Sequence, residues 1–137
     1  MKMDVLILAG APNEGALKEY APEKHEALIK IGDIPMVEYV INAVNKASRT
    51  EKVAVVGPRK EIEESIGQKV EIVVDSDNSM IGNLQNGVKE LNPQNYLLVI
   101  TSDIPLITSE VIDEFIDSCE DEKADIYYPI ISKQKNM

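Results

Sequence analysis

Residues 96–106 read YLLVITSDIPL, and this stretch decides the fold class of the chain. Its first five residues are apolar or aromatic, and Thr101, Ser102 and Asp103 follow directly. An uninterrupted apolar run of this length is typical of a strand buried on both faces, as in a parallel sheet. Pro105 stiffens the chain beyond it and holds the preceding residue in an extended conformation. The stretch therefore predicts a buried strand with a carboxylate just past its end.

Apolar runs of the same kind alternate with helical patterns along the rest of the chain. We expect further strands at residues 3–8, 52–56, 70–74 and 125–131, and helices at residues 35–46, 59–66 and 109–119. Ser79 should cap another helix with Ile81, Leu84, Val88 and Leu91 on one face, and the helix at 109–119 should turn Val111, Ile112, Phe115 and Ile116 inward. This order predicts one Rossmann-like domain over residues 1–137, a doubly wound, mainly parallel sheet inside a three-layer α/β/α arrangement.

The composition excludes several classes of protein. The 137 residues carry 14 Lys+Arg against 24 Asp+Glu, a net charge of −10, which lacks the basic field of a nucleic-acid-binding protein. No apolar run is long enough to span a bilayer, and no signal-peptide pattern follows Met1, so we expect a cytoplasmic protein without a membrane partner. The single cysteine, Cys119, excludes an internal disulfide and a cysteine zinc cluster, and the acids beside it should raise its pKa.

The residues that follow the predicted strands are the candidates for a binding site, because ligands of doubly wound sheets bind outside the carboxyl ends of the strands. The longest connection separates Ala9 from the helix near Pro35, and long loops in small domains are usually functional or mobile. Gly10 would let a ligand approach the main chain, whose N–H groups could hold phosphate oxygens. On spacing alone a plain surface loop is favoured over a phosphate site, since neither a Walker A loop nor a GxGxxG fingerprint is present.

Two further features leave alternatives open. Asp103 could hold Mg²⁺, which needs only one or two carboxylates beside substrate phosphates, or it could cap its own turn. The amides in residues 75–87 suit a base edge or a ribose, and they suit ordinary caps as well.

His25, the one histidine, has no nucleophile partner in a recognisable motif, which favours a surface histidine.

Taken together, these stretches resemble a known family. Residues 6–10 (LILAG), 26–40 (EALIKIGDIPMVEYV), 82–87 (GNLQNG) and 96–106 follow one another as at the start of a nucleotidyltransferase of the MobA-like NTP transferase family. The resemblance implies a GT-A-like fold that transfers a nucleotidyl group from an NTP to a phosphorylated sugar, a phospho-alcohol or a molybdopterin, with release of pyrophosphate. It covers the whole chain but only the N-terminal portion of such an enzyme. Apolar surface left by a missing half would promote a homodimer.

The resemblance also implies roles for individual residues. The nucleotide would be bound by Leu8, Ala9, Gly10, Ala11, Gly15, Gly82 and Asn83, with Mg²⁺ on Asp103 and catalytic charge from Lys18 and Lys30. The sequence departs from the family where an arginine usually clamps the phosphates, since only Lys18 is available there. Glu26 stands where the family has a lysine. An alternative is therefore a nucleotide-binding or regulatory module that has lost the chemistry; a receiver-type signalling domain ranks last, because Gly10 and Ala11 occupy the positions of its acids.

Overall fold

The computed structural model describes residues 2–12, 23–67, 69–77 and 79–119. The central sheet has the order β5-β4-β1-β6, and all of its strands are parallel. Its strands are β1 (Met3–Leu8), β4 (Thr50–Gly57), β5 (Ile72–Asp75) and β6 (Leu97–Thr101). Leu8 lies opposite Val56 on one side and Thr101 on the other, so β4, β1 and β6 end at the same edge of the sheet.

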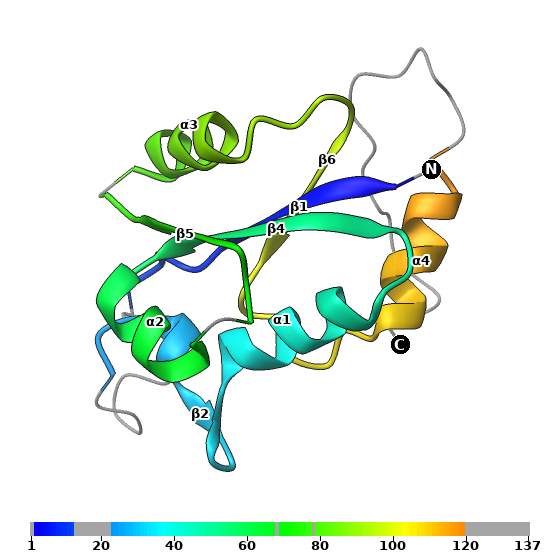
Figure 1. Ribbon diagram of the computed structural model, residues 1–137. Helices are drawn as coiled ribbons and strands as arrows, with labels where there is room; N and C mark the ends of the chain where they lie inside the picture. Colours follow the sequence, from blue (N-terminus) through cyan, green and yellow to red (C-terminus); the bar gives the residue numbers. More distant parts are fainter. Residues whose placement is uncertain (1, 13–22, 68, 78, 120–137) are drawn as a thin grey trace, which may run out of the picture.

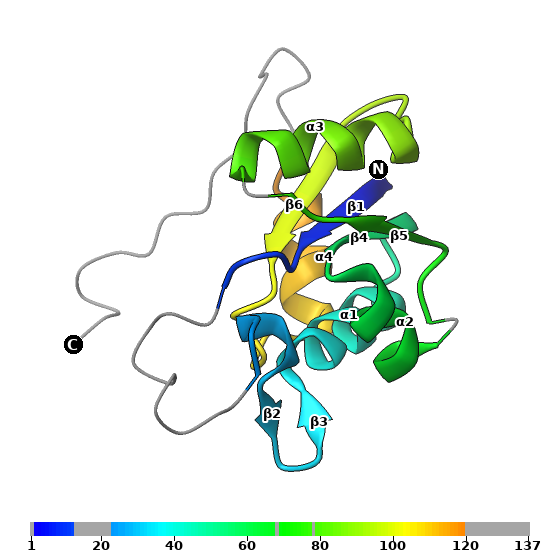
Figure 2. The same ribbon diagram turned by 90° about the vertical axis from the view of Figure 1, so that its left-hand side faces the viewer.

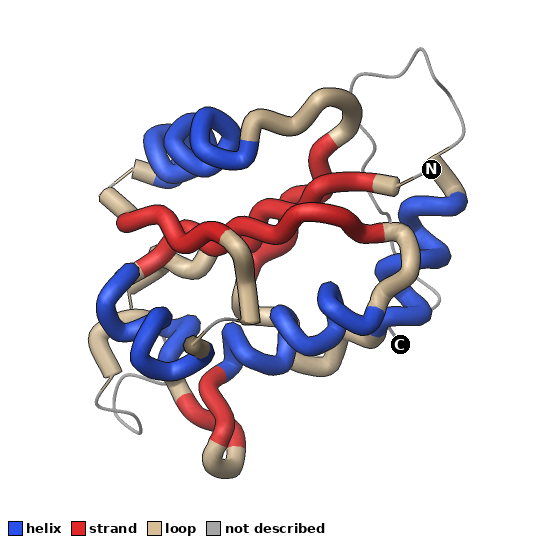
Figure 3. The backbone as a smooth tube through the Cα atoms, viewed as in Figure 1, coloured by secondary structure: helices blue, strands red, loops and turns tan. Residues whose placement is uncertain are grey.

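Helices cover both faces of this sheet, as Figures 1 and 3 show. The helices are α1 (Met36–Lys46), α2 (Arg59–Ile66), α3 (Met80–Leu91) and α4 (Ser109–Asp117). Helix α3 lies alone on one face, and α1, α2 and α4 lie on the other. The predicted doubly wound, three-layer α/β fold is therefore confirmed. The predicted strand at residues 125–131 lies outside the described residues.

The long connection after β1 contains structure that its sequence does not suggest. A 3-10 helix, η2 (Glu26–Leu28), is followed by an antiparallel pair of short strands, β2 (Lys30–Ile31) and β3 (Ile34–Pro35). Gly32 adopts a positive φ of 66° between these strands, a conformation that glycine tolerates best. Figure 2 shows this hairpin projecting away from the sheet below α1. No helix in the described part of the chain is long and apolar enough to cross a membrane.

The expected inward faces of two helices were partly wrong. In α3 the buried residues are Asn83, Gly87 and Leu91, whereas Ile81 is 69% exposed and lies on the solvent side. A methyl group on Gly87 would come within 2.6 Å of Leu6, so the helix packs on the sheet through a residue without a side chain. Because α3 approaches the sheet through Gly87, the apolar side chains of this helix lie only partly between the helix and the sheet.

Val88 of the predicted α3 face is also exposed. In α4, Ile112 and Ile116 are buried and Phe115 is partly buried against the core, but Val111 is 53% exposed. The spacing of apolar residues therefore predicted both helices correctly, but it predicted only some of the residues that each helix buries.

Asp113 on α4 ties this helix to the turn before β4. Its carboxylate accepts the backbone N–H of Ser48 at 2.9 Å and of Arg49 at 2.8 Å, together with the Ser48 hydroxyl at 3.0 Å. The hydrogen bond from the Ser48 backbone, aided by that from Arg49, lowers the pKa of Asp113 and outweighs the opposing effect of desolvation.

We expect Asp113→Asn to lower stability at pH 7, because the amide replaces the charged acceptor of these bonds. The folded pKa lies below the ordinary value of about 3.9, so the stabilisation is complete above that pH and is lost as the pH falls through the lowered pKa. Melting temperatures measured from pH 7 down to pH 2 should therefore converge for the two proteins. Glu110→Gln, which removes one exposed acid of the same helix, is the control, and a gap that did not narrow as the pH falls below 4 would contradict this account.

Candidate functional site

One pocket of about 520 Å³ lies where the sheet was expected to bind a ligand. Its lining comes from the end of β1, the start of η2, the turn between β5 and α3, and the end of β6. These residues are Leu8, Gly10, Ala11, Pro12, His25, Glu26, Ser76, Asp77, Met80, Asn83, Thr101, Ser102 and Asp103. The strand order reverses between β1 and β6, and this is the position at which doubly wound sheets bind ligands.

Backbone hydrogen bonds hold the loops of the pocket to the sheet. The N–H of Ala9 donates to Val56 O at 2.7 Å, and the N–H of Ser102 donates to Leu8 O at 3.2 Å. On the other side, the N–H of Ser76 donates to Gly57 O at 2.9 Å. The segments after β1, β5 and β6 therefore leave the sheet in fixed directions, which is a preorganised framework for a ligand.

Gly10 forms part of the pocket because it has no side chain. A Cβ atom at this position would lie 2.8 Å from Cβ of Ser76 and 3.2 Å from Nδ2 of Asn83. The loop after β1 can therefore approach the turn before α3 closely only with glycine here. This close approach brings together two of the segments that the sequence placed in the site.

Asp103 lies directly beyond β6 with its carboxylate exposed to the pocket. The Thr101 hydroxyl donates to Oδ1 of Asp103 at 2.6 Å, which orients the carboxylate. Within the described residues, no backbone N–H binds this carboxylate, so the capping role left open by the sequence has no donor there. The carboxylate is oriented and accessible, as a partial ligand for Mg²⁺ needs to be.

Asn83 performs a capping role rather than presenting a free amide. Its Oδ1 accepts the N–H of Asp77 at 2.6 Å, and its Nδ2 donates to the carbonyl of Asp77 at 3.5 Å. The Asp77 carboxylate in turn accepts the N–H of Ser79 at 2.7 Å. A side chain on Gly82 would collide with that carboxylate, 2.7 Å from Oδ2. Asn83 thus lines the pocket and fixes Asp77, whereas Gly82 lies against the Asp77 carboxylate and does not itself line the pocket.

His25 and Glu26 reach the pocket through a pairing that the sequence does not reveal. His25 forms an isolated antiparallel bridge with Pro12, and the N–H of Glu26 donates to the carbonyl of Ala11 at 3.1 Å. His25 is half-buried and lines the pocket, a position that its sequence neighbours do not indicate. Only the long-range pairing of the two segments identifies these residues.

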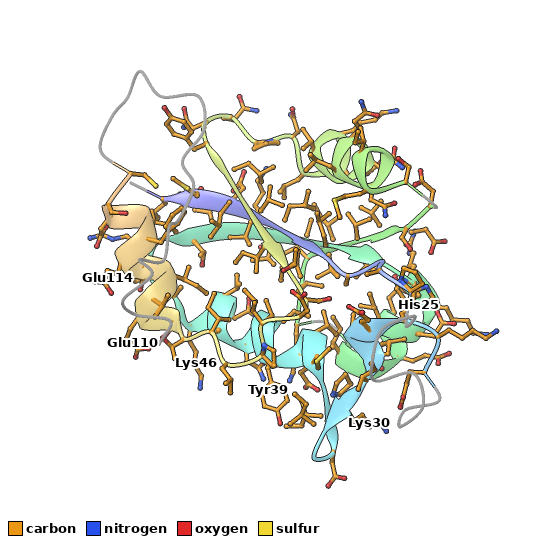
Figure 4. The ribbon with its side chains drawn as sticks, turned by 180° about the vertical axis from the view of Figure 1, so that it is seen from behind. His25, Lys30, Tyr39, Lys46, Glu110 and Glu114 are labelled. Atoms are coloured by element: carbon orange, nitrogen blue, oxygen red, sulfur yellow. The ribbon has the colours of Figure 1, made fainter. Side chains whose placement is uncertain are left out.

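Of the two lysines expected to supply charge, Lys30 is the one that the structure describes, and it is not brought to the pocket. Lys30 is exposed on β2, where it pairs with Pro35, and it does not line the pocket. Figure 4 shows Lys30 by the hairpin, apart from His25. Gly15 and Lys18 lie outside the described residues.

The charge of the pocket determines how it could take a phosphate. Its described lining carries the carboxylates of Glu26, Asp77 and Asp103 and no lysine or arginine. The described residues contain no group of three acidic, histidine or cysteine side chains placed to hold a metal ion by themselves. A divalent cation here would have to be shared between Asp103 and phosphate oxygens, which is how Mg²⁺ is commonly bound.

Other candidate positions in the described chain do not combine these features. A larger hollow of about 620 Å³ lies along the edge strand β5. Arg59 forms an ion pair with Glu63 there, at 2.9 Å. The loops that directly follow β1 and β6 contribute no residue to the described lining of this hollow. Cys119 is 3% exposed, and burial raises the pKa of its thiol, which argues against a reactive thiolate. The raised pKa was expected, although burial rather than the neighbouring acids causes it.

Comparisons with known proteins find similarity over most of the chain. Residues 15–136 match the family model of the MobA-like NTP transferase domain. The chain is 32% identical over 118 residues to the bifunctional protein GlmU of Acetivibrio thermocellus. This alignment covers 84% of this chain and 24% of the relative. The chain is 29% identical over 96 residues to GlmU of Enterococcus faecalis, covering 68% of this chain and 21% of the relative. The chain therefore spans about a quarter of the length of these relatives.

Solved structures share the fold. A hypothetical transferase from Thermus thermophilus has a TM-score of 0.70 at 24% identity, covering 87% of this chain and 47% of the other. A nucleotidyl transferase from Methanothermobacter has a TM-score of 0.70 at 21% identity, covering 85% and 57%. CMP:2-keto-3-deoxy-manno-octonic acid synthetase, solved with CTP, has a TM-score of 0.70 at 14% identity, covering 90% and 49%. At these identities the likeness concerns the fold.

Proposed function

Because the chain belongs to the MobA-like NTP transferase family, we propose that its pocket binds a nucleoside triphosphate together with Mg²⁺ for transfer of the nucleotidyl group. The acceptor would be a phosphorylated sugar, a phospho-alcohol or a molybdopterin. An acceptor oxygen attacks the α-phosphorus, the bond from the α-phosphorus to the bridging oxygen breaks, and pyrophosphate leaves. The observation that carries the proposal is the oriented carboxylate of Asp103 in the same pocket as the Gly10 loop.

Each side of the pocket has a distinct part in this proposal. The main chain of residues 8–11 would lie against the phosphates, with N–H groups beyond Ala9 as donors, because the Ala9 N–H already donates to Val56 O. The turn before α3, with Asp77 fixed by Asn83, would lie against the nucleoside. Asp103 would hold Mg²⁺, whose charge neutralises the α-phosphate and the leaving pyrophosphate. The protein then contributes position and orientation, which account for much of the catalysis of such transfers.

A second candidate function is binding of the nucleotide without chemistry. It is favoured by the carboxylate of Glu26 in the pocket and by the lack of lysine or arginine in the described lining. An acid beside a triphosphate repels the charge that a transferase must stabilise. Such a module would sense a nucleotide rather than consume it.

Release of pyrophosphate separates the two candidates. The 137-residue chain is incubated with Mg²⁺, each of the four NTPs and a panel of sugar phosphates and phospho-alcohols. Pyrophosphate that requires the NTP, the metal and one acceptor class supports the transferase. Nucleotide binding with no release across the whole panel favours the binding module instead.

A further inference from the structure

The single histidine of the chain is held against the loop that follows β1. The bridge between His25 and Pro12 and the hydrogen bond from the Glu26 N–H to the Ala11 carbonyl, 3.1 Å, join the two segments side by side. Within the described residues, no hydrogen bond engages the ring of His25, and its side chain does not cap η2. The ring therefore lines the pocket beside the proposed phosphate-binding main chain with its nitrogens available.

His25 also differs from the other ionisable side chains in the described lining of the pocket, because they are all acids. The groups that face the pocket are Glu26 on η2, Asp77 before α3 and Asp103 beyond β6, all of which are carboxylates. Next to His25 on its own segment lies Lys24, which is exposed and does not line the pocket. Among the described lining residues, His25 is thus the one side chain that can become a cation, and histidine changes its charge between about pH 5 and 8.

We propose that the imidazolium of His25 donates a hydrogen bond to the phosphates of the bound nucleotide and makes nucleotide binding dependent on pH. The inference rests on the proposed function and adds to it a phosphate-binding residue and a form of regulation. Hydrogen bonds between two charged groups are among the strongest in proteins, and this one exists only while the ring is protonated. Affinity should therefore fall as the pH rises through the titration of the ring.

The first test measures the affinity for Mg²⁺–NTP at pH 6 and pH 8 by calorimetry. Wild type should bind about tenfold more tightly at pH 6, the effect of one charge-assisted hydrogen bond. His25→Gln should bind as weakly at pH 6 as wild type does at pH 8, and His25→Lys should bind tightly at both. Lys24→Gln, which removes the neighbouring charge outside the pocket, is the matched control and should keep the wild-type profile. The nucleotide also titrates in this range, and comparison of the variants cancels its contribution.

A second readout follows the one histidine ring by NMR, which needs no assignment because the chain has a single histidine. Saturation with Mg²⁺–NTP should move the midpoint of its titration upward by about one pH unit, the counterpart of the tenfold change in affinity. If a nucleotide binds but the midpoint stays fixed, or His25→Gln keeps the wild-type profile, the inference is wrong and the proposed function stands. If no NTP binds at either pH, the proposed function fails and the inference fails with it.

Discussion

Asp103→Asn is expected to abolish the stabilisation that Mg²⁺ and an NTP give to the wild-type chain. A ligand at a hundredfold excess over its Kd raises the free energy of unfolding by about 2.7 kcal/mol, which is readily measured as a shift in melting temperature. Asparagine keeps the shape of the side chain and the bond from Thr101, but it loses the charge that attracts a divalent cation. Without the cation, the triphosphate would face the carboxylates of Glu26 and Asp77 uncompensated.

Whether Asp103→Asn weakens or strengthens nucleotide binding distinguishes binding with Mg²⁺ from binding without it. If the nucleotide bound without metal, removal of one carboxylate from an acidic pocket would strengthen binding, because it removes repulsion. Tighter binding by Asp103→Asn would therefore contradict the assigned role. Glu114→Gln is the control; it removes one exposed acid of α4, which Figure 4 shows far from His25, and should leave the stabilisation intact.

Leu6→Ala is expected to give the largest loss of stability of any substitution considered. Leu6 is fully buried in the small core beneath α3, together with Ala54, Val56 and Leu91. Truncation of a buried leucine costs about 2–5 kcal/mol, and the cost depends on how far the surroundings close around the cavity. Here α3 packs against Leu6 through Gly87, which has no side chain to fill the space.

The expected loss corresponds to a fall in melting temperature of roughly 7–17 °C for a chain of this size. It is a large fraction of the total stability of a typical domain, about 5–15 kcal/mol. Val99→Ala on β6, where the side chain is 43% exposed, is the control and should change stability by less than about 1 kcal/mol. A melting temperature for Leu6→Ala within about 3 °C of wild type would show that this core does not hold α3 on the sheet.

The fold could be read from the sequence because burial on both faces leaves a strong signal. The apolar runs at residues 3–8 and 96–100 became β1 and β6, and the residues after them, Gly10 and Asp103, do lie in one pocket. Ser79 and Thr108 cap α3 and α4 by accepting the N–H of Gly82 and of Val111. These features depend on local sequence or on the rule that parallel strands end at one edge.

What escaped prediction depends on contacts between distant segments. His25 and Glu26 enter the pocket only because their segment pairs with the loop after β1, and no local pattern encodes that pairing. The inward face of α3 was misjudged because Gly87 allows close packing that a hydrophobic pattern does not register. For Asn83 the sequence left open a ligand-binding amide and an ordinary cap, and only the structure shows its hydrogen bonds to the backbone of Asp77.

The central claim is that the pocket at the carboxyl ends of the strands, and not the larger hollow along β5, binds a nucleotide with Mg²⁺. The most direct test follows the backbone amides by NMR as each of the four NTPs is added with and without Mg²⁺. The account predicts metal-dependent shifts, for at least one NTP, that are largest at Gly10, Ser76, Asn83 and Asp103. Shifts centred on Arg59 and Glu71 along the β5 edge, or no shift with any NTP, would contradict it.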